Sequence, residues 1–200
     1  MGEKPVLTLM VGLPGSGKTT LAKRLEAETG AVRFTPDEWH LFLFGDDFHH
    51  PEEHALHDAR HDRVEQLMWS LGKGLLQKGV SVILDFGFWA REEREEKYRE
   101  AMALGARFQI CYAHAPLEEL CRRLRAPMHE SVQPTCEEVA DWVRNLALSV
   151  CRREHEVFGI PLRTASHWLT FMKERVPEPV SMKLLSVCDR IKVFTVGTCS

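Results

Sequence analysis

The sequence predicts an α/β fold whose parallel sheet begins with a phosphate-binding loop. The apolar run at residues 6–11 is followed by a glycine-rich segment, residues 12–19, of the pattern G-x-x-x-x-G-K-[ST], and then by a helical pattern. Apolar runs alternate with helical patterns up to residue 125, which indicates a right-handed parallel sheet. The continuous apolar run at residues 80–85 is typical of a strand that is buried on both faces of such a sheet.

The glycine-rich segment predicts a nucleotide-binding site. Glycines let the backbone turn its N–H groups toward a phosphate, and the helix that follows directs its positive end at the same phosphate. The Lys18 ammonium is expected to reach the β- and γ-phosphates of ATP, and the Thr19 hydroxyl is expected to bind Mg²⁺. The residues expected to bind the nucleotide are Gly12, Leu13, Pro14, Gly15, Ser16, Gly17, Lys18, Thr19 and Thr20.

The other elements follow from apolar spacing and from residues that start or end helices. The first helix is expected to stop at Gly30, and the capping box of Thr135 and Glu138 is expected to open a late helix. Strands are expected at residues 31–34, 80–85, 107–112 and 190–196. Helices are expected at residues 51–77, 91–104, 116–125 and 164–175, while residues 35–39 are expected to be a loop and 40–50 an irregular connection.

Composition favours a soluble globular protein of the cytoplasm. The chain is 44% hydrophobic and 28% charged, and its net charge of −3 offers no general attraction to nucleic acid or to an anionic membrane. No apolar run approaches transmembrane length, and residues 1–5 leave no room for a signal peptide before the first strand. The six cysteines form no CxxC pair and are expected to be reduced thiols.

Two carboxylates that follow apolar strands are candidates for the chemistry of the site. Asp85 ends a buried run, where it could hold Mg²⁺ directly or through water, or could cap the strand–loop junction. Asp37 lies just beyond the second strand, at the sheet edge where open α/β sheets bind ligands. It is expected either to accept a proton from an attacking hydroxyl or to cap a helix, and one residue can do both.

The predicted helix at residues 116–125 ends in a basic cluster. Arg122, Arg123 and Arg125 could stabilise the charge that develops on a transferring phosphoryl group, or could simply pair with the helix C-terminus. Arg122 and Arg125 share a helix face, while Arg123 points elsewhere.

Histidines and aromatic residues gather near these candidates. His54, His57 and His61 share one helical face, which we interpret as a hydrated face in preference to a metal site or a pocket wall, because no set of cysteine or acidic ligands is evident. The aromatic residues near Asp37 and Asp85 could line a substrate pocket, although core packing is the default interpretation. These aromatic residues are Trp39, Phe42, Phe44, Phe48, Phe86, Phe88 and Trp89.

Residues 6–125 resemble small P-loop kinases, the predicted ATP-binding kinases that are grouped with AAA-type ATPases. The layout is similar to polynucleotide 5′-hydroxyl kinases, chloramphenicol phosphotransferases and zeta-toxin kinases, and the resemblance rests on residues 12–19, 35–39, 82–89 and 120–124. It implies a P-loop NTPase fold with a five-stranded parallel sheet, helices on both faces and a helical lid. It also implies Asp37 as general base and Arg122 or Arg125 as a phosphate clamp. The segment after Gly159 departs from the family pattern.

The sequence therefore predicts a single kinase-like domain with a nucleotide-binding core at 1–125, a lid at 126–158 and a divergent segment at 159–200. Its expected reaction moves the γ-phosphoryl group of ATP, with Mg²⁺, to a hydroxyl of a small molecule. A nucleic-acid 5′-hydroxyl is the second hypothesis, disfavoured by acidic residues that would better suit a cationic substrate: Glu38, Asp46, Asp47, Glu52 and Glu53. The third hypothesis is a nucleotide-dependent binding module in which slow hydrolysis switches the lid.

Overall fold

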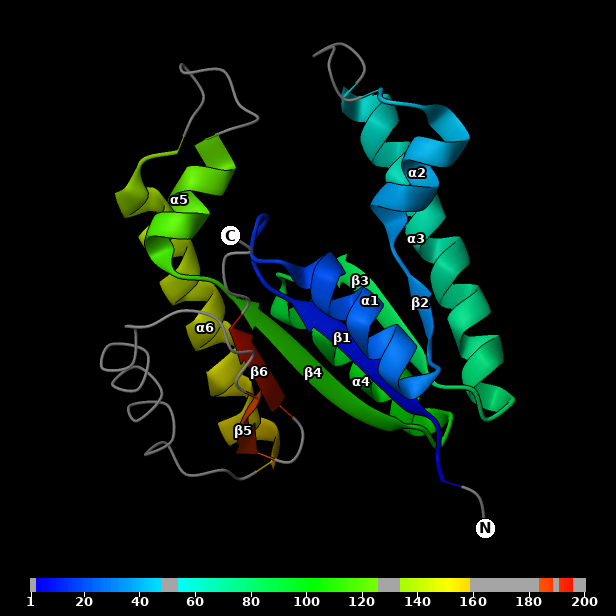
Figure 1. Ribbon diagram of the computed structural model, residues 1–200. Helices are drawn as coiled ribbons and strands as arrows, with labels where there is room; N and C mark the ends of the chain where they lie inside the picture. Colours follow the sequence, from blue (N-terminus) through cyan, green and yellow to red (C-terminus); the bar gives the residue numbers. More distant parts are fainter. Residues whose placement is uncertain (1–2, 48–53, 126–133, 159–183, 189–190, 196–200) are drawn as a thin grey trace.

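A computed structural model describes residues 3–47, 54–125, 134–158, 184–188 and 191–195 of the chain. Six strands form one sheet in the order β2-β3-β1-β4-β6-β5 (Figure 1). The strands are β1 Val6–Val11, β2 Val32–Phe34, β3 Val82–Gly87, β4 Arg107–His114, β5 Leu184–Cys188 and β6 Ile191–Thr195. All neighbours are parallel except β5, which pairs antiparallel with β6 at the edge of the sheet.

The predicted α/β fold with a parallel sheet is thus confirmed. The sheet differs from the expected one by the antiparallel strand β5, which the sequence analysis did not include, while β6 lies within the predicted segment 190–196. The helices are α1 Lys18–Thr29, α2 Pro36–Phe44, α3 His54–Gln77, α4 Arg91–Ala103, α5 Leu117–Arg125 and α6 Cys136–Phe158. Within the described ranges, no helix is both long and apolar enough to cross a membrane.

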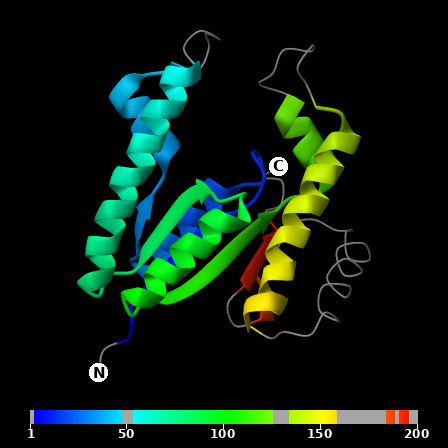
Figure 2. The ribbon, with the colours of Figure 1, turned by 180° about the vertical axis from the view of Figure 1, so that it is seen from behind.

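The strands bury alternate side chains in two cores, one on each face of the sheet. Leu7, Leu9 and Val11 of β1 belong to the core that contains buried residues of α3, α4, α5 and α6. Met10, between them in sequence, belongs to the core formed with α1. Figure 2 shows α4 and α6 on the face opposite to α1. Because successive residues of a strand point to opposite faces, a parallel strand between two helical layers must be apolar at nearly every position.

Helix α2 occupies residues for which the sequence analysis predicted a loop. Pro36 stands at its first position, and the carboxylates of Asp37 and Glu38 lie in its first turn, where the helix dipole favours them. The helix ends at Gly45, whose φ is 74° and whose N–H donates to the Leu41 carbonyl at 3.0 Å. The apolar residues 41–44 are all exposed, so this short helix has no amphipathic period from which it could be predicted.

The predicted lid is described only in part, since residues 126–133 lie outside the described ranges, as does the helix expected at residues 164–175. The capping box opens α6 as predicted: Thr135 N–H donates to the Glu138 carboxylate at 2.8 Å, and Glu138 N–H donates to the Thr135 hydroxyl at 3.2 Å. Val139 and Leu146 of α6 are buried in the core. The described part of α6 therefore packs on the sheet layer, and a lid function for this segment stays a prediction.

His114, the last residue of β4, makes the stability of the fold depend on pH. Burial lowers the pKa of His114 to about 4, whereas an unfolded histidine has a pKa near 6.5. The unfolded chain binds the additional proton between these two values, so stability is complete above about pH 6.5 and falls as the pH decreases toward 4. We expect this residue to cost about 2 kcal/mol at about pH 5 relative to about pH 7.5. Urea unfolding of the wild type and of His114→Gln at both pH values tests this: the loss is expected to shrink in the variant, and equal losses in both proteins would contradict it.

Candidate active site

The loop between β1 and α1 has the backbone geometry that the glycine pattern predicts. Gly12, Gly15 and Gly17 have φ angles of 154°, 75° and 87°. A Cβ atom at Gly12 would lie 2.6 Å from the Ala113 carbonyl oxygen and 2.6 Å from the Ser16 hydroxyl, so no other residue fits there. Gly17, in the left-handed conformation, is the N-cap of α1. The loop therefore ends at the positive end of a helix, as an anion-binding site requires.

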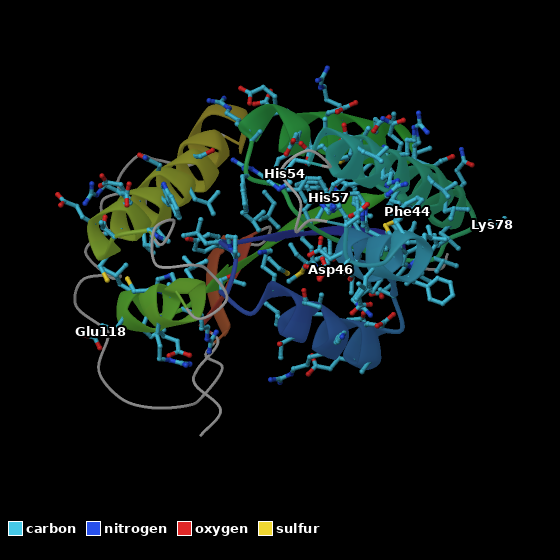
Figure 3. The ribbon with its side chains drawn as sticks, turned by 90° about the horizontal axis from the view of Figure 1, so that it is seen from above. Phe44, Asp46, His54, His57, Lys78 and Glu118 are labelled. Carbon is cyan, nitrogen blue, oxygen red and sulfur yellow. The ribbon has the colours of Figure 1, made fainter. Side chains whose placement is uncertain are left out.

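A cleft of about 650 Å³ opens at this loop. Six of the nine residues predicted to bind the nucleotide line it, whereas Leu13 and Ser16 are buried and Gly12 is absent from the lining. Figure 3, seen from above, places Glu118 of α5 on one side of this end of the sheet and Phe44, Asp46 and His57 of α2, its following loop and α3 on the other. The full lining is Pro14, Gly15, Gly17, Lys18, Thr19, Thr20, Pro36, Asp37, His61, Asp85, Phe86, Gly87, Trp89 and Arg123.

The Lys18 ammonium folds back onto the phosphate-binding loop. Its Nζ donates to the Leu13 carbonyl at 3.1 Å. Burial lowers the pKa of Lys18, and the negative charges of Asp85 and Asp37 act in the opposite direction. This cation lies between a phosphate-binding loop and two carboxylates. It could therefore contact a bound phosphate and both carboxylates.

Asp85 is a buried carboxylate with one oxygen available to a ligand. The Thr35 hydroxyl donates to Oδ2 at 3.3 Å, while Oδ1 is buried and has no hydrogen-bond partner among the described residues. Burial raises the pKa of Asp85, and hydrogen bonds from Thr19 and Thr35 and the charge of Lys18 oppose this effect. Asp85 lies inside β3, which continues to Gly87, so a cap at the strand–loop junction does not describe it. The Asp85 carboxylate and the Thr19 hydroxyl are hard oxygen groups of the kind that Mg²⁺ prefers as ligands.

Arg33 and Thr35 position Asp85, a connection that the sequence analysis missed. The Arg33 guanidinium donates to the Thr35 hydroxyl, which in turn donates to Asp85. Arg33 also pairs with Glu26 at 3.0 Å and with Glu38 at 3.0 Å. Both carboxylates hold the guanidinium in place next to the Thr35 hydroxyl, which donates to Asp85. Arg33 and Thr35 come close to Asp85 only through the register between β2 and β3. A single sequence does not reveal that register.

Asp37 points into the same cleft from the first turn of α2. Its side chain is 88% exposed, and its Oδ1 lies 3.2 Å from His61 Nε2. The hydrogen bond with His61 lowers the pKa of Asp37, and the charge of Lys18 adds to the effect. The N-cap of α2 is Thr35, so the interpretation of Asp37 as a helix cap is wrong. Asp37 is therefore an ionised, accessible acceptor of protons and hydrogen bonds next to the phosphate-binding loop.

The histidine face of α3 is not simply hydrated. His61 lines the cleft beside Asp37, and the same contact raises the pKa of His61. His57 Nδ1 and His40 Nε2 lie 2.6 Å and 2.7 Å from the same Asp47 oxygen. These three donor atoms are mutually within 4.8 Å, but Arg60 pairs with the other Asp47 oxygen at 2.8 Å. We interpret this network as a structural contact that holds α3 against the loop that follows α2. The helical face that His57 and His61 share was the sequence signal for the contacts of His61 with Asp37 and of His57 with Asp47.

The structure places Arg123, and not Arg122, in the lining of the cleft. Arg123 lines the cleft, and its guanidinium donates to the Gly15 carbonyl at 2.7 Å and to Glu119 at 2.5 Å. Arg122, one of the two arginines that the resemblance named, is 68% exposed, pairs with Glu119 at 2.6 Å and does not line the cleft. α5 turns the face that carries Glu119 and Arg123 toward the loop, so Arg123 replaces Arg122 as our candidate for the phosphate clamp. The side chain of Arg125 lies outside the described residues.

An aromatic turn closes the cleft next to β3. Trp89 Nε1 donates to the Gly12 carbonyl at 3.0 Å, which fixes the indole to the phosphate-binding loop. Phe88 has a φ of 41°, a left-handed conformation that costs a bulky residue about 1–3 kcal/mol. The fully buried Arg94 donates to the Phe88 and Trp89 carbonyls at 2.8 Å each and so holds the strained turn. Two of the predicted aromatic residues, Phe86 and Trp89, line the cleft. Phe88 is buried in the core, and Trp39 packs against the core and against the ring of Phe34. Phe42 and Phe44 are exposed, and Phe48 lies outside the described residues.

A glycine loop at a helix N-terminus, a lysine in that loop and a buried carboxylate on the adjacent parallel strand define a P-loop nucleotide-binding protein of the α/β class. The chain belongs to the AAA domain family, whose pattern it matches over residues 7–155. The resemblance predicted from the sequence is thereby confirmed.

Individual relatives share part of the chain. It is 33% identical over 123 residues to the bifunctional enzyme NodQ of Rhizobium tropici, and 31% identical over 125 residues to an Aeropyrum pernix protein named "probable adenylyl-sulfate kinase". Each similarity covers 60% of this chain, but only 18% of NodQ and 65% of the A. pernix protein. A chain in the Pnkp1/Rnl/Hen1 RNA repair complex has the same fold, with a TM-score of 0.55, 22% identity, and coverage of 76% of this chain and 47% of that chain.

Proposed function

We propose that this protein is a kinase that transfers the γ-phosphoryl group of ATP to a hydroxyl of a small molecule, with Mg²⁺ as cofactor. The observation that carries the proposal is Asp37, an exposed carboxylate in the same cleft as Lys18 and Asp85. Nucleotide binding alone requires no accessible carboxylate facing the phosphates, whereas a hydroxyl acceptor requires a group that orients it and accepts its proton. The A. pernix relative, named as a kinase, supports the same class of reaction.

Each group in the cleft has a role in this reaction. The loop N–H groups and Lys18 would bind the phosphates, and Thr19 and Asp85 would hold Mg²⁺, which neutralises phosphate charge when it is bound. Asp37 would accept a hydrogen bond from the acceptor hydroxyl and take its proton as the new O–P bond forms and ADP leaves. His61, 3.2 Å from Asp37, would keep the carboxylate ionised and oriented. Most of the acceleration would come from positioning and charge neutralisation.

The two other hypotheses predict different surfaces and different responses. A nucleic-acid acceptor needs a basic track beside Asp37, but the neighbouring cleft is lined by five carboxylates and two lysines. A nucleotide-dependent switch would hydrolyse ATP without an acceptor and would not need Asp37. Both alternatives are separated from the kinase by the identity of the product and by the effect of one substitution.

Asp37→Asn is expected to reduce phosphoryl transfer at least about 100-fold while ATP affinity stays within about threefold, because general-base residues contribute to the transfer step and not to nucleotide binding. The purified protein would be given Mg·ATP and a library of small hydroxyl compounds, and products heavier by one phosphoryl group would be sought by mass spectrometry. Asp58→Asn, an exposed carboxylate of α3 outside the cleft lining, is the matched control. ATP hydrolysis that no compound stimulates, and that Asp37→Asn leaves unchanged, would contradict the proposed function.

A further inference from the structure

A second cleft opens between α3 and α4, next to the phosphate-binding site. Its volume is about 740 Å³, which is within the range of small-molecule pockets. It shares the walls Phe86 and Trp89 with the cleft that contains Lys18 and Asp37. The cleft is lined by Asp62, Glu65, Gln66, Trp69, Lys73, Phe86, Phe88, Trp89, Ala90, Glu93, Glu96, Lys97 and Glu100. A molecule bound here could therefore extend one end past the shared wall toward Asp37.

Negative charge is unevenly compensated along this cleft. At the end away from the shared wall, Lys73 pairs with Glu100 at 3.3 Å, and Lys97 lies 3.5 Å from Glu96. Three further carboxylates lie closer to the phosphate cleft along the two helices: Asp62 and Glu65 follow the cleft-lining His61 on α3, and Glu93 stands in the first turn of α4, just after the shared Trp89. Among the described residues, neither Asp62 nor Glu93 forms an ion pair, and Glu65 is 3.7 Å from His61.

The three carboxylates near the shared wall repel one another. Burial raises the pKa of Glu65; the positive charge of His61 opposes this effect, the negative charges of Glu93 and Asp62 add to it, and the charge of Lys97 opposes it more weakly. Like charges at close range are costly unless a cation lies between them. A bound cation at this end of the cleft would relieve the repulsion, and an anion would increase it.

The aromatic walls of the cleft favour the same kind of ligand. The Trp69 ring already has two ammonium groups near its centre, those of Lys73 at 5.6 Å and Lys97 at 5.3 Å. Trp89 and Phe86 line the same cleft as the three carboxylates, and within the described ranges neither ring has a cation–π contact. Aromatic faces and carboxylates together are the usual environment of bound ammonium compounds.

We propose that the cleft between α3 and α4 binds the phosphoryl acceptor, and that this acceptor is an alcohol that carries an ammonium group. The ammonium would lie among Asp62, Glu65 and Glu93, and the hydroxyl would reach Asp37. This inference rests on the proposed function for the role of the hydroxyl. The sequence analysis also suggested a cationic substrate, but it assigned the binding of that substrate to other carboxylates. Of the acidic residues that suggested such a substrate, Glu38 pairs with Lys23 and Arg33, and Asp47 with Arg60 and two histidines.

Binding is tested with pairs of compounds that differ only in charge. Choline and its neutral isostere 3,3-dimethyl-1-butanol form the first pair, followed by longer amino alcohols and their N-acetyl derivatives, titrated calorimetrically with a non-hydrolysable ATP analogue present. We expect at least one ammonium compound to bind about tenfold or more tightly than its neutral partner. Glu93→Gln and Asp62→Asn are expected to reduce that preference severalfold, and Glu92→Gln, an exposed neighbour outside the cleft, is expected to leave it unchanged. No preference in any pair, or a preference that Glu93→Gln and Asp62→Asn do not change, would overturn the inference.

The same compounds, offered as acceptors with Mg·ATP, separate the inference from the proposed function. Phosphorylated ammonium alcohols, with their neutral partners left unmodified, would support both. Phosphorylation of neutral or anionic alcohols in preference to their ammonium counterparts, dependent on Asp37, would support the kinase and overturn the cationic acceptor. Selective binding of ammonium compounds without any phosphorylated product would retain the cation site and contradict the kinase.

Discussion

Replacing Lys18 with methionine is expected to reduce phosphoryl transfer about 1,000-fold or more. Methionine has a similar length but no charge, so the substitution removes the one cation that lies inside the phosphate-binding loop. The side chain is held there by the Leu13 carbonyl, 3.1 Å from Nζ, and by the charges of Asp85 and Asp37. In the transition state the γ-phosphoryl oxygens carry the developing charge, and a preorganised donor aimed at them contributes by orders of magnitude. The loss should therefore exceed that of Asp37→Asn, because positioning and charge neutralisation dominate this class of reaction.

Lys23→Met is the matched control for this substitution. Lys23 lies on the same helix, but its side chain is half exposed and pairs with Glu38 at 2.8 Å outside the cleft lining. Turnover at saturating ATP and calorimetric ATP affinity should be measured for both variants, with thermal unfolding as a check of folding. Turnover of Lys18→Met within about tenfold of the wild type would show that the loop lysine does not face the reacting phosphoryl group.

The parts of this protein that were predictable are those whose chemistry is local in the sequence. The loop at residues 12–19 combines a glycine pattern, a preceding apolar strand and a following helix, and each feature is visible within a few residues. The strand at 82–87 is apolar on both faces, because helices cover both faces of the sheet. Asp85 and Asp37 could be expected to line one cleft because the carboxyl ends of parallel strands meet at one edge of the sheet.

The parts that were not predictable depend on how elements face one another. Arg122 and Arg123 are adjacent in the sequence, and only the orientation of α5 on the loop decides that Arg123 reaches Gly15. His61 became a partner of Asp37 because α2 and α3 lie side by side, although the two residues are 24 positions apart. Helix α2 was missed because its apolar residues are exposed and thus carry no period. The contacts of Arg123 and His61 each join two separate elements. A single sequence does not show how such elements are oriented relative to each other.

The distribution of charge around the cleft gives the proposed reaction a direction. Lys18 and Arg123 lie on the side of the phosphate-binding loop, where ATP would place its phosphates. Asp37 lines the same cleft from α2, and the carboxylates of the cleft between α3 and α4 lie past the shared residues Phe86 and Trp89. An anionic donor and a cationic acceptor would thus be drawn to opposite ends of one continuous site, with the transferring phosphoryl group between them.

Arg123→Gln is expected to reduce phosphoryl transfer about 1,000-fold, and Arg122→Gln by less than about threefold. The two arginines are neighbours on α5, and both pair with Glu119, at 2.5 Å and 2.6 Å, so each substitution removes one ion pair to the same carboxylate. They differ in what else they contact: only Arg123 reaches the Gly15 carbonyl and lines the phosphate cleft. A guanidinium at the phosphoryl oxygens is worth about 10³-fold or more in this class of reaction.

The pair of variants separates catalysis from stability within one experiment. If the arginines act only through Glu119, the two substitutions should reduce turnover and thermal stability to a similar extent. If Arg123 contacts the phosphates, turnover should fall only in Arg123→Gln, and Arg123→Lys should recover only part of it, because an ammonium cannot reproduce the planar fork of a guanidinium. A larger loss of turnover in Arg122→Gln than in Arg123→Gln would return the role to one of the two arginines that the resemblance had named, and would require α5 to rotate on the loop when nucleotide binds.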